Sequence, residues 1–266
     1  MAKFLDTAFS LGKVALKSRK AGVSMRKEKG GRLVIMGNGP SLANCIASDS
    51  ESLLSQDTMA VNFAANTPEF FRLCPRHYVL ADPHFFSDKD ENVKKLWGNL
   101  QKADWPITLH IPARAKVPEP TGATIQHFNM TPAEGYDAVC HTLYAKALAM
   151  PRPRNVLIPA LMEGIRDGYE EIFIVGADHT WPHSLYVDEA NRVVTVQPHF
   201  YKEDPKELER IAEVYSSVRI HDILQSMAVA FRSYHLVEAY AKKKGVAIFN
   251  STPGSLIDAF TRKPLR

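Results

Sequence analysis

The chain has 266 residues, of which 45% are apolar and 23% charged, and it contains 14 glycines and three cysteines. The apolar content excludes a disordered chain, and the glycine and cysteine counts exclude collagen-like and disulfide-scaffold proteins. No apolar run is long enough to cross a membrane as a helix. The length suits one large domain, and cysteines without paired spacing indicate a reducing, cytoplasmic compartment.

The formal net charge of +4 is distributed unevenly along the chain. Residues 1–30 carry a net charge of +6, so residues 31–266 carry a net charge of −2. A nucleic-acid-binding domain would spread basic residues over its folded surface, so we expect no nucleic-acid partner. The uneven distribution of charge predicts a basic N-terminal segment over residues 1–30 and a folded domain over residues 31–266.

Within the first segment, residues 3–20 have a helical pattern. Apolar residues and lysines form two stripes with helical spacing, one of Phe4, Ala8, Leu11 and Ala15 and the other of Lys13, Lys17 and Lys20. This pattern predicts a basic amphipathic helix. Two interpretations stay open: a helix lying on an anionic membrane surface, or an ordinary surface helix. The apolar stretch is interrupted by lysines, which is not typical of a signal peptide.

The domain alternates predicted strands and helices. We expect strands over residues 32–36, 58–62, 77–80, 107–111, 124–128, 171–175 and 246–249, and helices from Leu42 and over residues 134–150, 158–166 and 223–243, with a last helix after Ser255. The alternation predicts an α/β fold with a single doubly wound, mostly parallel sheet of the Rossmann-like type. Residues 179–204 interrupt the alternation and predict a lid that includes a hairpin of residues 185–187 and 192–196.

Small or polar residues follow five of the predicted strands. They are Gly37-Asn-Gly-Pro-Ser41, Asn62, Asp82, Gly176-Ala-Asp178 and Asn250-Ser-Thr-Pro-Gly254. Because ligands bind at the carboxyl ends of the strands in doubly wound sheets, these residues predict one site. The turn at Gly37–Ser41 suits a phosphate, since its glycines admit close approach and a helix N-terminus follows. It matches neither the dinucleotide fingerprint nor the P-loop.

The stretch Leu33-Val-Ile-Met-Gly-Asn-Gly-Pro-Ser-Leu42 resembles the N-terminal signature of the bacterial sialyltransferases of glycosyltransferase family 42. It is also similar to the wider group related to archaeal 6-hydroxymethylpterin diphosphokinase. The resemblance continues in order through Val61-Asn62, Asp82-Pro83, the segment 168–178 and Asn250-Ser-Thr-Pro-Gly-Ser-Leu256. It spans about residues 32–260 and implies a variant of the GT-A-like glycosyltransferase fold.

The sialyltransferase resemblance implies transfer of a CMP-activated acidic sugar, sialic, other nonulosonic or Kdo-like, to a surface glycan or lipopolysaccharide, without an essential metal or other cofactor. The implied donor-binding residues are Gly37, Asn38, Gly39, Pro40, Ser41, Asn62 and Asp82, with Asn155, Thr180 and Ser251 completing the set. In that family a pair of lid tyrosines binds the leaving phosphate. Their positions fall on Tyr186 and Thr180.

Candidates for moving the acceptor proton lie near the end of the 171–175 strand. Asp178 is followed by His179 and His183 in the predicted lid, and His221 stands beside Asp222 at the start of a helix. Histidine and carboxylate side chains are the usual general acids and bases. For Asp178 two roles stay open, orientation of a histidine or ribose and nucleophilic attack in a retaining transfer. Further candidates are His199, His235, Arg152, Arg154 and Trp181.

Two alternative functions stay open. A diphosphokinase would move diphosphate from ATP to a small alcohol, with Asp82 and Asp178 holding Mg²⁺. A non-catalytic protein would bind the nucleotide sugar on the same scaffold. In the transferase interpretation we expect a cytoplasmic protein, held at the inner face of the membrane by residues 1–30. The sequence does not decide the acceptor, the stereochemical outcome, or whether the chain forms a homo-oligomer.

Overall fold

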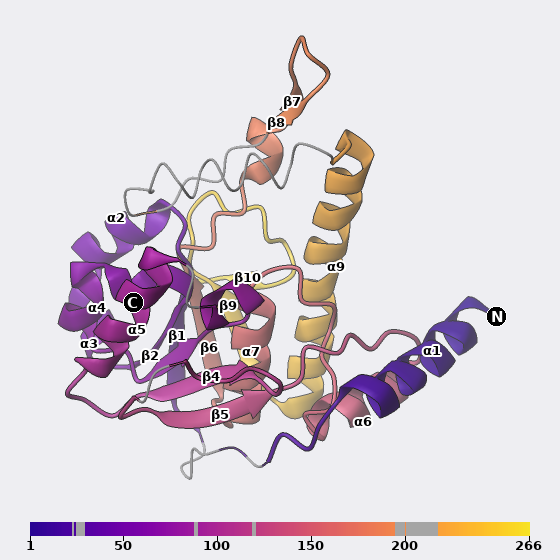
Figure 1. Ribbon diagram of the computed structural model, residues 1–266, viewed down its shortest axis with the longest axis horizontal. Helices are drawn as coiled ribbons and strands as arrows, with labels where there is room; N and C mark the ends of the chain where they lie inside the picture. The colour runs from indigo at the N-terminus through magenta and orange to yellow at the C-terminus, as the bar shows by residue number, and fades with distance from the viewer. Residues whose placement is uncertain (23, 25–29, 88–89, 119–120, 195–199, 201–217) are drawn as a thin grey trace.

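The computed structural model describes residues 1–22, 24, 30–87, 90–118, 121–194, 200 and 218–266. Within these residues, eight strands form one sheet in the order β10-β9-β6-β1-β2-β3-β4-β5 (Figure 1). Every neighbouring pair in this sheet is parallel. The predicted single, doubly wound parallel sheet is therefore confirmed.

The strands occupy nearly the predicted positions. They are β1 (Arg32–Met36), β2 (Asp57–Val61), β3 (His77–Val79), β4 (Thr108–Pro112), β5 (Thr124–Phe128), β6 (Glu171–Val175), β9 (Ala247–Asn250) and β10 (Thr261–Arg262). The order changes direction at β1, whose neighbours are β2 and β6. This change of direction places a crevice beside the carboxyl end of β1, where ligands bind in such sheets.

Helices cover both faces of the sheet. The covering helices are α2 (Ser41–Ser48), α3 (Ser50–Leu54), α4 (Pro68–Leu73), α5 (Glu91–Gln101), α6 (Asp137–Ala145), α7 (Leu157–Arg166) and α9 (Ile220–Lys244), and α1 (Ala2–Lys17) precedes the sheet. Figure 1 shows α2 to α5 on one side of the sheet and α6, α7 and α9 on the other. None of the helices in the described part of the chain is long and apolar enough to span a bilayer.

Strand β1 shows why both faces need cover. Leu33 and Ile35 belong to the core under α6, α7 and α9, whereas Val34 and Met36 belong to the core under α2, α4 and α5. Successive strand residues point to opposite faces, so an uninterrupted apolar strand requires two cores. The run Leu-Val-Ile-Met therefore encodes a central strand, as predicted.

Two helix predictions are wrong. The helix expected over residues 134–150 is confined to α6, because Ala147 has a positive φ of 52° and the Leu148 N–H bonds to the Leu143 carbonyl. The last helix, expected after Ser255, does not form. The Asn250 amide and the Arg262 guanidinium both bind the Ile257 carbonyl, at 3.1 Å each, and hold the segment in turns before β10.

The described part of the predicted lid contains a short 3₁₀ helix, η3 (Trp181–Ser184), and a hairpin of β7 (Tyr186–Val187) and β8 (Val193–Val194). The hairpin turn is closed by Asp188, which accepts from the Arg192 main-chain N–H at 2.8 Å. Figure 1 shows the hairpin projecting away from the sheet. Residues 195–199 and 201–204 of the predicted lid, including His199, lie outside the described residues.

Candidate functional site

The carboxyl ends of β1 and β6 meet through their main chains. The Gly37 N–H donates to the Val175 carbonyl and the Gly39 N–H to the Gly176 carbonyl, both at 2.8 Å. A Cβ on Gly37 would lie 2.5 Å from the Gly176 oxygen, and a Cβ on Gly176 would lie 2.4 Å from the Gly37 oxygen. Glycine is therefore required at both strand ends, and the predicted turn is held in one conformation.

Asp178 caps the helix that follows this turn. Its Oδ2 accepts from the Ser41 hydroxyl at 2.8 Å and from the Ser41 main-chain N–H at 3.4 Å. A Cβ on Gly39 would lie 2.0 Å from the same oxygen. The N-terminus of a helix attracts negative charge, and here the chain's own carboxylate lies at the N-terminus of α2. An anion bound at this place must displace Asp178 or lie beside it.

Asn38 has a polar atom available at the same turn. The side chain is 8% exposed, its Nδ2 donates to the Val61 carbonyl at 3.2 Å, and its main-chain carbonyl accepts from Phe200 N–H at 2.9 Å. No hydrogen bond to Asn38 Oδ1 comes from the described residues, although this oxygen is buried. Since a buried acceptor without a partner costs about 1–3 kcal/mol, Oδ1 suits the hydroxyl of a ligand.

The loop after β9 supports the turn that carries Asp178. The Ala177 N–H donates to the Thr252 hydroxyl at 3.1 Å, and the Ser255 hydroxyl donates to the Ala177 carbonyl at 2.7 Å. The Leu256 N–H donates to the Asp178 carbonyl at 3.0 Å. Ser251, a predicted donor-binding residue, instead donates its hydroxyl to the Lys263 carbonyl at 2.6 Å. The described contacts of this loop therefore fix the position of Asp178.

Asn62 and Asp82 begin short 3₁₀ helices at the same edge of the sheet. Asn62 opens η1 (Asn62–Asn66) with a positive φ of 52°, and its carbonyl accepts from the Tyr78 hydroxyl. Asp82 is exposed and caps η2 (Pro83–Phe86) by accepting from the His84 N–H at 2.8 Å. Asn62 follows β2, which pairs in parallel with β1, and Asp82 follows β3, which pairs in parallel with β2. Both residues therefore lie at the predicted edge of the sheet.

His179 lies in a buried chain of polar side chains. Its Nε2 is 2.6 Å from the Tyr234 hydroxyl of α9, which donates to Asn155 Oδ1 at 3.0 Å. The Leu157 N–H also donates to this oxygen, which ties Asn155 to the start of α7. Burial lowers the pKa of His179 to about 3, so its imidazole is neutral near pH 7. The Trp181 ring lies over it at 4.1 Å between centroids.

The other predicted catalytic and lid residues lie apart from Asp178 in the described contacts. His183 is exposed on η3, Tyr186 is 55% exposed on β7, and Thr180 is half-buried before η3. His221 is exposed at the start of α9 with its Nε2 3.3 Å from Asp222 Oδ1. His235 pairs with the exposed Asp258 at 3.1 Å. Among the described residues, these side chains therefore do not come together with Asp178 in one site.

The two predicted arginines, Arg152 and Arg154, have different surroundings. Arg152 forms an ion pair with Glu134 at 2.7 Å, and Arg154 is exposed. Together with the contact of Arg232 on the same carboxylate at 2.9 Å, Arg152 counters burial and holds the pKa of Glu134 below its ordinary value. Arg154 is therefore exposed to solvent, whereas the charge of Arg152 is balanced by Glu134.

A buried polar cluster, formed around β3, β4 and α7, was not predicted. His77 Nδ1 is 3.0 Å from His110 Nε2, and Asp167 Oδ2 lies 3.7 and 3.8 Å from these two atoms. His110 also donates to Glu163 at 3.1 Å, and the Gln126 amide joins both carboxylates at 2.8 Å. His77, His110 and Asp167 each offer one atom that could ligate a metal ion, and these atoms lie within 4.8 Å of one another. The sequence signal was the pair Glu163 and Asp167, spaced i and i+4 at the end of an apolar helix.

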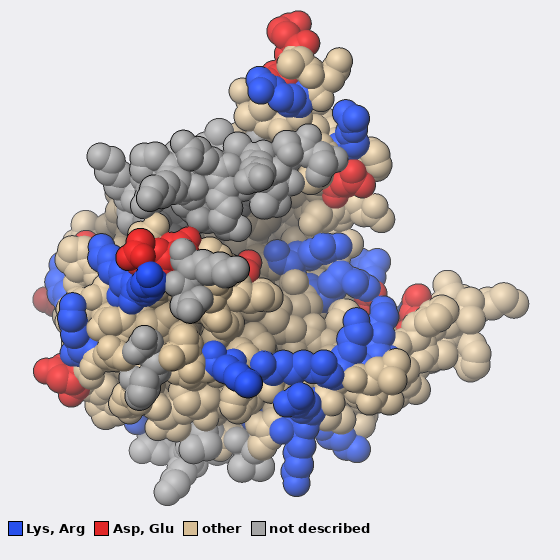
Figure 2. Space-filling model, in the orientation of Figure 1, with Lys and Arg blue, Asp and Glu red and all other residues tan. Residues whose placement is uncertain are grey.

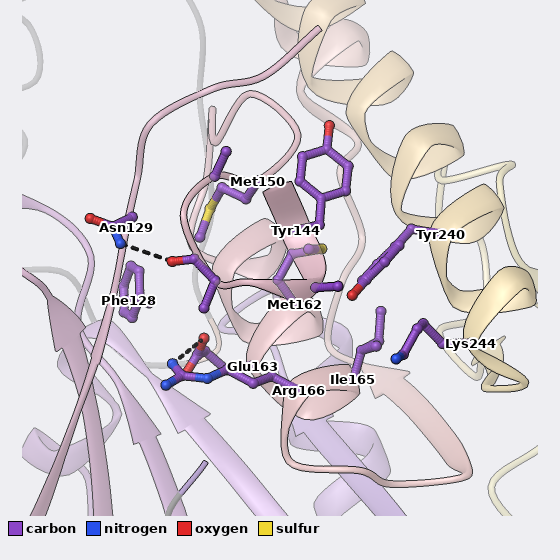
Figure 3. Close-up of a pocket in the computed structure, with 13 residues that line it drawn as sticks. Phe128, Asn129, Tyr144, Met150, Met162, Glu163, Ile165, Arg166, Tyr240 and Lys244 are labelled. Atoms are coloured by element: carbon purple, nitrogen blue, oxygen red, sulfur yellow. Dashed lines mark hydrogen bonds and ion pairs between the residues drawn. The ribbon is translucent and has the colours of Figure 1, made fainter. Parts of the chain in front are cut away.

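A pocket borders this cluster (Figure 3). Its labelled walls are mostly apolar or aromatic side chains of α6, α7 and α9, with the Glu163–Arg166 ion pair on one side. Arg166 and Lys244 end the helices that lead into β6 and β9, so this part of the pocket lies toward the amino ends of those strands. It is thus separate from the turn that carries Gly37 and Asp178.

These observations define a Rossmann-like α/β protein with a polar turn at the carboxyl edge of its sheet. Among solved structures, it is similar to the MAf glycosyltransferase from Magnetospirillum magneticum AMB-1, with a TM-score of 0.54 and 10% sequence identity. The match covers 98% of this chain and 38% of the other, so the chain spans about two fifths of that protein's length. Neither models of protein families nor curated protein sequences give a match. At this identity the likeness establishes the fold.

Proposed function

We propose that the protein is a glycosyltransferase that transfers a CMP-activated acidic sugar, sialic, other nonulosonic or Kdo-like, to a surface glycan or lipid-linked acceptor. The turn from β1 to α2 carries the proposal, because it combines close main-chain packing, a helix N-terminus and a buried acceptor, Asn38 Oδ1. The resemblance of Gly37–Ser41 to the sialyltransferase signature and the fold shared with a glycosyltransferase support it.

In this proposal the donor phosphate takes the place of the Asp178 carboxylate at the start of α2. The Ser41 hydroxyl and main-chain N–H, now directed at Asp178, would donate to the phosphate instead. Asn38 Oδ1 would accept a hydroxyl of the ribose. Asp178, released from Ser41, would take the proton of the acceptor hydroxyl. The oxygen of that hydroxyl would at the same time attack the anomeric carbon of the donor sugar. The bond to the phosphate breaks with its electron pair, and CMP leaves.

His179 is assigned a positioning role rather than that of a charged acid. Its pKa of about 3 keeps the imidazole neutral near pH 7, and its Nε2 already contacts the Tyr234 hydroxyl. The chain His179–Tyr234–Asn155 links the residue after Asp178 to the start of α7. Loss of this chain would therefore loosen the segment that carries Asp178.

Nucleotide-dependent thermal stabilisation tests the donor. We expect CMP to raise the melting temperature more than UDP, GDP or ADP at equal concentration, because a ligand that binds only the folded state stabilises it. A clear preference for another nucleotide would contradict the CMP-sugar donor. Substitution of Asn38 by Asp, which replaces the amide that donates to the Val61 carbonyl by a carboxylate that this carbonyl repels, should displace the turn and abolish the CMP effect. Leu54→Gln, on the surface of α3, should keep it.

Further measurements distinguish the transferase from the two alternatives, a diphosphokinase and a non-catalytic binding protein. A larger stabilisation by ATP with Mg²⁺ than by CMP would replace the transferase by a diphosphokinase with Asp82 and Asp178 as ligands. Nucleotide binding without any hydrolysis of CMP-sugars or transfer to acceptors would indicate a binding protein. Release of CMP from a CMP-sugar, lost in Asp178→Asn, supports the transferase. We expect a cytoplasmic enzyme.

A further inference from the structure

Helix α1 contacts the domain through its polar side. Thr7 and Ser10, the buried residues of α1, are 8% and 4% exposed. The Ser10 hydroxyl donates to the Glu134 carbonyl at 2.9 Å, and the Tyr136 N–H donates to the Thr7 hydroxyl at 2.9 Å. An amphipathic surface helix ordinarily turns its apolar side to the core. Here, within the described residues, only the half-buried Val14 of this helix packs against the core, and the large apolar side chains of the helix are exposed instead.

This orientation is fixed by close packing at both ends of the contact. A Cβ on Gly135 would lie 2.1 Å from the Thr7 hydroxyl and 2.7 Å from its main-chain nitrogen. After the helix, the Ser18 hydroxyl donates to the Leu148 carbonyl at 2.6 Å, and the Asn129 amide donates to the Arg19 carbonyl at 2.7 Å. These bonds hold α1 at one rotation about its axis, with the same side outward.

The outward side of α1 is apolar. Its large side chains are about half to four-fifths exposed, namely Phe4 62%, Leu5 48%, Phe9 66%, Leu11 47% and Leu16 80%. At 3.6 residues per turn, Leu5, Phe9 and Leu16 fall opposite Thr7 and Ser10, whereas Phe4 and Leu11 lie on the flank beside Thr7. Figure 1 shows α1 projecting from the rest of the molecule. Contiguous exposed apolar surface of this kind marks an interaction site.

Basic residues occupy the other half of α1 and the segment that follows it. Lys3, Lys13 and Lys17 lie on the polar half of α1, against the single acidic residue Asp6, and Arg19 and Lys20 follow. The exposed Arg114 donates to the Leu16 carbonyl at 3.3 Å at the end of the helix. In Figure 2, Lys and Arg side chains gather where α1 joins the domain, next to the tan surface of the helix.

We propose that α1 anchors the protein to an anionic membrane surface, with its apolar side inserted at the boundary between headgroups and acyl chains. A helix with Phe and Leu on one side and lysines on the other has the composition of an interfacial helix. The long side chains of the lysines on the polar half then reach the level of the negatively charged headgroups. Pairing with a second copy through this surface would instead bring two equally basic helices together. The proposal is independent of the sugar donor.

Sedimentation of the full chain with vesicles tests the anchor. We expect binding to vesicles of phosphatidylcholine with phosphatidylglycerol, weaker binding to phosphatidylcholine alone, and weakening by salt. The double variant Phe4→Gln/Phe9→Gln should lower the partition coefficient at least tenfold. Leu54→Gln, which removes a 58% exposed leucine from α3, should leave it unchanged. Lys17→Gln/Lys20→Gln should weaken binding about fivefold for each charge removed.

Three outcomes would overturn the anchor. The first is no binding of the full chain to anionic vesicles, and the second is binding that survives the Phe4→Gln/Phe9→Gln change. The third is a dimer in analytical ultracentrifugation that this double variant converts to a monomer, which would assign the surface to a second copy. Circular dichroism and the melting temperature should match those of the unsubstituted chain, because neither phenylalanine is buried.

Discussion

Substitution of Gly37 by alanine tests the contact between β1 and β6 on which the candidate site depends. The new Cβ would lie 2.5 Å from the Gly176 oxygen, 3.0 Å from the Gly176 carbonyl carbon and 3.3 Å from the Val175 oxygen. All three are main-chain atoms at the centre of the sheet, so no side chain can rotate away. The φ of Gly37 is not positive, and the cost therefore arises from packing alone.

Overpacking of a well-packed core costs about 1–3 kcal/mol, and a main-chain obstacle places Gly37→Ala near 3 kcal/mol. At about 2–4 °C per kcal/mol for a domain of this size, the melting temperature should fall by roughly 6–12 °C. The variant should also lose CMP stabilisation, because the strand ends must separate. The matched control is Gly98→Ala in α5, where a Cβ meets nothing within 4 Å.

Differential scanning fluorimetry of both variants provides the measurement. Gly98→Ala should melt at or slightly above the temperature of the unsubstituted protein, because alanine favours a helix over glycine by about 1 kcal/mol. A melting temperature for Gly37→Ala within about 2 °C of the unsubstituted protein would refute the reasoning. The two strand ends would then not be held together by their main chains.

Three further predictions concern single side chains. Asp178→Asn should bind CMP about tenfold more tightly, because the carboxylate no longer competes for the start of α2. Sugar transfer should be lost in this variant. Weaker CMP binding would instead show that Asp178 itself contacts the donor. His179 has a folded pKa of about 3 against 6.5 in the unfolded chain, so its contribution to stability is full above pH 6.5 and falls as the pH drops toward 3. His179→Gln should flatten the fall in melting temperature between pH 6.5 and 5, and equal slopes would contradict a buried neutral imidazole. Glu163→Gln should destabilise the fold by about 3–5 kcal/mol in urea unfolding, because Arg166 loses its buried partner, and a loss below about 1 kcal/mol would count against that pairing.

The sign of the Glu163 effect follows from its surroundings. Burial disfavours the charged carboxylate, but the contacts of His110 and Arg166 outweigh it and hold the pKa of Glu163 below its ordinary value. The carboxylate is therefore charged in the folded protein near neutral pH. Its stabilising contribution is present above its unfolded pKa and is lost as the pH falls through the folded value.

The sequence by itself determined the sheet and the place of the site. Apolar runs such as Leu33–Met36 can only be buried on both faces, and their alternation with helices requires parallel pairing. Parallel strands bring their carboxyl ends to one edge, so the sequence alone assigns Gly37, Asp178 and the loop after β9 to one place.

Only the tertiary structure decided which partner each polar group takes. Asp178 caps α2 through Ser41, 137 positions earlier in the chain, and His77 meets His110 across neighbouring strands. Helix α1 shows the same limit: its periodicity predicted two sides, but the hydrogen bonds of Thr7 and Ser10 decided which side meets the domain. Periodicity reports the local geometry of a helix or strand, whereas the choice of partner depends on groups brought together from distant parts of the chain.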